Sequence, residues 1–178
     1  MMTKILCLSG SLRAASSSRA VLETICRNLG DRVSVTRFDI GALPHYNADL
    51  DLPDPVPALK SAIDEADGLI IVTPEYNYSV PGVLKNAIDW ASRPAYASVF
   101  LGKPVFVVST SGGALGGVRA QAHLKYVLNG MLARVFPWQE IVVTHANKKV
   151  KDGLLDDEAT ETFLLQGVDA FVRSLERD

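Results

Sequence analysis

The sequence predicts an α/β protein, a three-layer sandwich in which one five-stranded parallel sheet in strand order 2-1-3-4-5 lies between two layers of helices. Short apolar runs alternate along the chain with segments whose apolar residues recur at helical spacing. Two of these runs are continuously apolar, as expected for strands that are buried on both faces. The length of 178 residues suits one domain, so we expect residues 1–178 to fold as a single unit.

Five strands are predicted from the apolar runs. They cover Lys4–Leu8, Val33–Phe38, Gly68–Thr73, Pro104–Ser109 and Ile141–Thr144. Because five strands alternate with five helices, the doubly wound order 2-1-3-4-5 with right-handed crossovers follows.

The helices are predicted from apolar stripes and from start and stop signals. In the first, Val21, Ile25 and Leu29 share one face, and Gly30 can end the helix. Pro81 suits the first turn of another, because proline has no N–H to leave unpaired there. A second helix is predicted from about Val56 to Ala66, and the third, which Pro81 begins, carries the stripe Val83, Leu84, Ala87, Ile88 and Ala91. A fourth is predicted from the Gly112–Gly117 loop to about Leu132, and the last carries the stripe Leu164, Val168, Phe171 and Leu175.

One connection is too long to be a simple link between strand and helix. It runs from Gly41 to Pro55, is rich in Pro and Asp, and is predicted to lie over a functional face.

Composition excludes several classes of function. The net charge is −2 and no run of Lys or Arg is present, so no nucleic-acid partner is expected. No segment approaches the roughly 18 apolar residues of a membrane span, and the apolar run Ile5–Leu8 is too short for a signal peptide. We therefore expect a cytoplasmic protein without a membrane partner. Cys7 and Cys26 are expected to be buried, and no cluster of side chains has metal-ligand spacing.

In a doubly wound sheet, ligands bind at the carboxyl ends of the strands, near the switch in strand order. For this order the relevant loops are Ser9–Ser18, Thr73–Pro81 and Ser109–Gly117. The first loop holds five serines and Arg13, contains no acidic residue and runs into a helix N-terminus. Those features favour an anion, and the missing Walker A and G-x-G-x-x-G spacings favour one phosphate, as in a mononucleotide.

The second and third loops can hold a flat ring. Pro74 to Gly82 is a stiff turn in which aromatic residues flank Asn77, and its backbone amides can bond the edge of a heterocycle. The third loop carries four glycines, which allow its backbone to approach a ring closely. The alternative for each of these two loops is an ordinary connection from strand to helix that binds no ligand.

The segments Gly10–Arg13 with Ser16 and Arg19, and Pro74–Trp90, resemble the NADPH-dependent FMN reductase family, and within it the bacterial quinone and chromate reductases. The likeness extends over most of the chain. It implies a flavodoxin-like fold, non-covalently bound FMN, and a homodimer or homotetramer. One departure is Ser18, where the family commonly has Asn; serine still offers a donor to phosphate.

Carried over to this chain, the resemblance assigns two groups of cofactor-binding residues. Ser11, Arg13, Ser16 and Ser18 are expected to hold the phosphate. Pro74, Glu75, Tyr76 and Asn77, with Ser111 and Gly112, are expected to line the isoalloxazine ring.

The function implied is transfer of hydride from NADPH or NADH, through FMN, to a small acceptor such as a quinone, chromate, or a nitro or azo compound. Because solvent can supply the protons, no catalytic acid or base is named. One alternative is a flavin reductase that supplies free reduced FMN. Two others are a flavodoxin-type electron carrier and a flavin-binding regulator.

Several other residues have assigned or open roles. His123 is expected to be structural, His45 is a candidate for contact with substrate, and no role is assigned to His145. Glu75 either orients a partner of the ring or faces a neighbouring subunit. The remaining expectations are a Lys85–Asp89 pair on one helix, and Trp90 and Tyr96 packed against a partner chain.

Overall fold

The computed structural model describes residues 2–176, which form a main sheet, five α-helices and a small hairpin. The strands are β1 (Lys4–Ser9), β2 (Ser34–Arg37), β3 (Gly68–Pro74), β4 (Pro104–Thr110), β5 (Arg134–Val135) and β6 (Ile141–Val143), with β7 (Val150–Lys151) and β8 (Leu154–Leu155) forming the hairpin. The helices are α1 (Ser17–Leu29), α2 (Val56–Glu65), α3 (Gly82–Ala91), α4 (Val118–Gly130) and α5 (Glu158–Leu175), with 3-10 turns η1 (Gly30–Arg32), η2 (Ile40–Ala42) and η3 (Ala146–Lys148).

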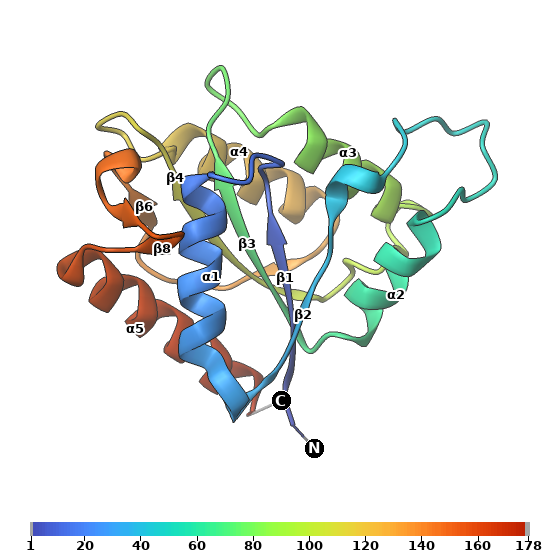
Figure 1. The fold of residues 1–178 in the computed structure, drawn as a ribbon. Coiled ribbons are helices and arrows are strands. Elements are labelled where there is room, and N and C mark those ends of the chain that lie inside the picture. Colours follow the sequence, from blue (N-terminus) through green and yellow to red (C-terminus); the bar gives the residue numbers. More distant parts are fainter. Residues whose placement is uncertain (1, 177–178) are drawn as a thin grey trace.

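The main sheet confirms the predicted strand order. It runs β2-β1-β3-β4-β5, β6 also pairs with β4, and every pairing is parallel. The helices lie on both faces of this sheet, so the fold is the predicted flavodoxin-like sandwich (Figure 1).

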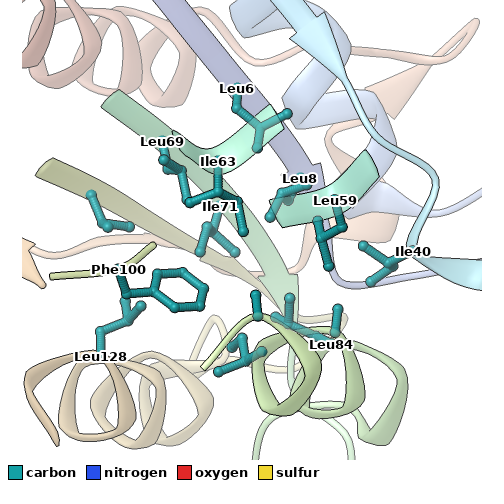
Figure 2. Close-up of a cluster of buried hydrophobic side chains, with 14 of the residues drawn as sticks. Leu6, Leu8, Ile40, Leu59, Ile63, Leu69, Ile71, Leu84, Phe100 and Leu128 are labelled. Atoms are coloured by element: carbon teal, nitrogen blue, oxygen red, sulfur yellow. The ribbon is translucent and has the colours of Figure 1, made fainter. Parts of the chain in front are cut away.

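Alternate residues of the central strands fill two separate cores. On one face Leu69 and Ile71 of β3 pack with side chains of α2, α3 and α4, a cluster that Figure 2 shows. On the other face Ile70 and Val72 pack with α1 and α5. All seven residues of β3 are buried, which explains its continuously apolar sequence. Burial of each such aliphatic side chain contributes about 1.5–3 kcal/mol.

The last strand of the sheet is divided, which the sequence did not predict. The prediction of Ile141–Thr144 matches β6, but β5 precedes it and pairs with the start of β4. Phe136 N still donates to Val105 O at 2.9 Å, and Pro137 then follows, which has no N–H to continue the ladder. The α4 helix also ends at Gly130, two residues before the predicted end.

The long connection after β2 is held against α3. Trp90 Nε1 and Asn86 Nδ2 donate to Pro44 O at 2.8 and 2.9 Å, and Tyr46 N donates to Asn86 Oδ1 at 2.7 Å. The remainder of the connection projects beyond α2 and α3 (Figure 1). Its predicted place over a functional face therefore stays a prediction.

An aromatic cluster supports the divided strand. Phe171 of α5 is fully buried, with its ring centroid 5.6 Å from that of Phe106 and 5.5 Å from that of Phe136. Phe171→Ala should lower the free energy of unfolding by about 3–5 kcal/mol, because the vacated space lies between strands and helix and cannot close fully. Urea unfolding measures this loss, and partly buried Phe163 on the same helix gives the control Phe163→Ala, with a smaller loss. Equal losses would contradict the placement of the core.

Candidate functional site

Three loops meet at the carboxyl edge of the sheet, as the strand order predicts. β3 pairs with β1 on one side and with β4 on the other, so the loops after these strands are neighbours. Ser11 Oγ lies 3.3 Å from Tyr76 Oη, which joins the first and second loops. Ser18 Oγ lies 3.3 Å from Thr110 Oγ1, which joins the start of α1 to the end of β4.

The first loop is built around the start of α1. Ser16 is the N-cap, and its hydroxyl accepts from Ser18 N at 3.2 Å. The Ser18 hydroxyl is fully buried between Ser16 Oγ and Thr110 Oγ1. Ser18 therefore holds the N-cap residue Ser16 in place through hydrogen bonds. Its direct contact with phosphate stays a prediction.

The same loop presents donors that have no acceptor among residues 2–176. They are the backbone N–H groups of Leu12, Ala14, Ala15, Ser17 and Arg19. The exposed side chain of Arg13 forms no ion pair in the described part of the chain. With the positive end of the α1 dipole and no acidic residue between Ser9 and Arg19, this arrangement fits a phosphate dianion.

The second loop ends in a tight hairpin turn. Tyr76 and Ser79 exchange two backbone hydrogen bonds of 3.1 Å, and the two residues between them have positive φ, 48° at Asn77 and 67° at Tyr78. Two central residues with positive φ are the signature of a type I′ turn. A tyrosine is uncommon in this conformation, so backbone strain is present beside the predicted ring site.

Glu75 fastens the second loop to α4. Its Oε2 accepts from the backbone N–H groups of Arg119 and Ala120 at 3.0 and 3.2 Å, and Arg119 Nη1 donates to its Oε1 at 3.3 Å. The residue at the N-cap of α4 is Gly117, with φ 83°, so no side chain is available there to cap the helix. The Glu75 carboxylate supplies the missing acceptor. The two roles predicted for Glu75, orienting a partner of the ring and facing a neighbouring subunit, stay predictions.

Two further contacts join the same elements. Ser79 Oγ lies 3.0 Å from His123 Nδ1, and the Arg119 guanidinium lies 4.5 Å from the centre of the Tyr78 ring. The first contact fits the structural role predicted for His123. The sequence pattern pointed to the aromatic residues beside Asn77, but nothing in it indicated Arg119 or its contact with Tyr78, because the two residues lie about 40 positions apart.

A hollow of about 390 Å³ lies between the second and third loops. It is bordered by Glu75, Asn77, Tyr78, Ser111, Gly113, Ala114, Leu115 and Arg119. A second hollow, of about 440 Å³, is bordered by Ser16 and Arg19 at the start of α1 and by Arg37 at the end of β2. Of the predicted ligand-binding residues, Glu75, Asn77 and Ser111 border the first hollow and Ser16 borders the second.

The other predicted residues border neither hollow. Ser11 is buried, Arg13 and Tyr76 are exposed, and Gly112 is exposed in the third loop. Pro74 is the buried last residue of β3. Their contacts with a ligand stay predictions.

The cysteines are both free and buried, as predicted. A hydrogen bond to Cys26, together with burial, raises the pKa of the Cys7 thiol above its ordinary value. The same hydrogen bond and the positive charge of Arg37 lower the pKa of Cys26. Residues 2–176 contain no group of His, Cys, Asp and Glu that could hold a metal ion, and none of their helices is long and apolar enough to cross a bilayer.

Of the remaining predictions, one is confirmed, one is wrong and the others stay predictions. Lys85 Nζ contacts both carboxylate oxygens of Asp89 at 2.7 and 2.9 Å, so the predicted pair is confirmed. The prediction that Trp90 packs against a partner chain is wrong, because its side chain is buried and bonded to Pro44 within this chain. Tyr96 is 74% exposed, and its contact with a partner stays a prediction. His45 is exposed in the connection that packs on α3.

Known proteins resemble this chain over nearly its whole length. The model of the NADPH-dependent FMN reductase family matches residues 3–148. A 2-hydroxy-1,4-benzoquinone reductase from Burkholderia sp is 39% identical over 174 residues, covering 96% of this chain and 95% of that protein. A quinone reductase from Escherichia coli (strain K12) is 38% identical, with 98% and 96% covered. The flavoenzyme NAD(P)H:(acceptor) oxidoreductase FerB from Paracoccus denitrificans superimposes with a TM-score of 0.89 at 39% identity, with 98% of each chain covered.

The capping contact of Glu75 can be tested through stability. Glu75→Ala should lower the free energy of unfolding by about 1.5–3 kcal/mol, since two N–H groups of α4, one of them partly buried, lose a charged acceptor. Glu75→Gln keeps an acceptor oxygen and should cost clearly less. Urea unfolding measures both, with Glu140→Ala as the control, because Glu140 forms only an exposed pair with Lys125. A loss for Glu75→Ala no larger than the control's would refute the cap.

Proposed function

The chain belongs to the NADPH-dependent FMN reductase family, and we propose that it binds FMN and catalyses electron transfer from NADPH or NADH to quinones. The observation that carries this proposal is the meeting of the first loop, with its unpaired N–H groups, and the two loops that border the 390 Å³ hollow. A phosphate and a flat ring are the two ends of FMN, and these loops offer a place for each.

The first loop holds the phosphate in this proposal. The N–H groups of Leu12, Ala14, Ala15 and Ser17 donate to the phosphate oxygens, and Arg13 adds a charged donor from the rim. The Ser16 hydroxyl caps α1 and is oriented by the buried hydroxyls of Ser18 and Thr110. No acidic side chain of the loop opposes a dianion.

The second and third loops hold the ring. Their backbone amides bond its edge, while Tyr78, Leu115 and Arg119 leave an open hollow beside it. The chemistry that FMN supplies when bound is two-electron transfer, with hydride accepted from the nicotinamide and then passed to the acceptor. Amide donors at the ring edge stabilise the negative charge that reduction places there.

Both substrates are proposed to reach the same hollow in turn, which predicts a ping-pong scheme. The ring of Tyr78, the side chain of Leu115 and the guanidinium of Arg119 border this hollow. Together they suit a flat acceptor that carries oxygen atoms, such as a quinone. The relatives whose names specify quinones agree with this choice, and they make release of free reduced FMN the less favoured alternative.

Purified protein mixed with NADPH or NADH without oxygen tests the proposal. The protein should be yellow or take up FMN, the nicotinamide should bleach the flavin absorbance, and a benzoquinone should restore it. Steady-state double-reciprocal plots should give parallel lines. Flavin that stays with the protein on ultrafiltration after reduction would reject the free-FMN alternative. Protein that binds no FMN would overturn the whole proposal.

The phosphate site can be tested separately from the ring site. Arg13→Ala should raise the dissociation constant of FMN about ten- to hundredfold, the effect of losing a hydrogen bond to a charged group. It should leave the affinity for riboflavin, which has no phosphate, unchanged. Quenching of flavin fluorescence measures both constants. The control is Arg27→Ala, at the other end of α1, where Arg27 pairs with Glu23. Equal loss for both flavins would place Arg13 away from the phosphate.

A further inference from the structure

A short turn after β6 lies between the first and third loops. This turn is η3, and its middle residue is Asn147. Asn147 Oδ1 accepts from Ser17 Oγ, in the first turn of α1, at 3.1 Å. On its other side, the Nδ2 atom lies against Gly112, only 2.7 Å from where a Cβ atom on that residue would be. One amide side chain therefore contacts both the start of α1 and the third loop.

The backbone that carries Asn147 is firmly held to the third loop. Ser111 N donates to Val143 O at 3.0 Å, Ala146 N to Ser111 O at 2.9 Å, and His145 N to Gly113 O at 3.0 Å. Ala146 is fully buried in the core beneath. These three bonds fix the turn to loop residues 111–113, so the Asn147 side chain is what extends from that unit to α1.

Gly112 leaves room for this arrangement. A Cβ atom there would lie 2.7 Å from Asn147 Nδ2, so the amide that accepts from Ser17 would have to shift. The lack of a Cβ at this position thus preserves the contact, in addition to any close approach of the loop to a ring.

We propose that Asn147 is a positioning residue for the flavin: it holds the N-terminus of α1 and loop residues 111–113 at a fixed separation. The proposal rests on the proposed function, in which the first element binds the phosphate and the second borders the ring. FMN joins the two through one chain of covalent bonds, so a protein that already holds them at the correct distance binds it with less loss of conformational freedom. Riboflavin, which engages only the ring site, gains nothing from that separation.

Asn147→Ala should therefore raise the dissociation constant of FMN about three- to tenfold, the usual range for one neutral hydrogen bond. The constant for riboflavin should not change, and the melting temperature of the flavin-free protein should stay within about 2 °C, because the side chain is exposed. Asn129→Ala is the matched control: Asn129 is an exposed asparagine near the end of α4, at the opposite edge of the sheet. Wild-type protein must first bind FMN, so failure of the proposed function is seen before any variant is compared.

Double variants show whether Asn147 acts through its two neighbours. Ser17→Ala should weaken FMN binding as much as Asn147→Ala, and the double variant should be no weaker than either alone. Gly112→Ala should cost FMN affinity in the wild-type background, and add nothing to Asn147→Ala. An unchanged FMN constant in Asn147→Ala, an equal loss of riboflavin affinity, or additive losses with Ser17→Ala would each overturn the proposal.

Discussion

The parallel pairing of β3 with β1 on one side and with β4 on the other controls the geometry of the candidate site. Ser9 lies beside Val72, and Thr73 beside Ser109, so the three strands end nearly level. Their loops consequently leave the sheet at one edge and from adjacent positions. Every contact described at the site, from Ser11 with Tyr76 to Glu75 with α4, is a short link between segments that this pairing has already brought together.

Among the helices that begin at this edge, α1 and α4 differ in what surrounds their N-termini. The N-terminus of α4 is occupied from within, because the Glu75 carboxylate accepts from its first N–H groups. At the N-terminus of α1, the N–H groups of Ser17 and Arg19 have no acceptor among residues 2–176. Both ends attract negative charge, but only one is available to a ligand. In the proposed function this difference directs the phosphate to α1 and leaves the region beside α4 for uncharged ring atoms.

Local pattern predicted most of the fold and the positions of the loops, but few of the contacts inside the site. The continuous apolar strand β3 and the stripe of α1 follow from burial and period alone. The division of the last strand was missed, because Arg134 and Val135 have no pattern of their own and pair only where β4 passes them. Packing of Trp90 within its own chain could not be predicted from local pattern, because its acceptor, Pro44, lies 46 residues away. The contacts of Glu75 and Asn147 could not be predicted for the same reason: each depends on partners that tertiary folding supplies.

The division of the outermost strand also affects how the molecule meets others. An unbroken outer strand offers a regular row of N–H and carbonyl groups to which a second polypeptide can add. Here the row is interrupted after Phe136 by Pro137, and only two short pieces, β5 and β6, lie along β4. A foreign strand would find too few consecutive bonds to dock. The division that the sequence pattern did not predict thus disfavours addition of a strand along β5 and β6.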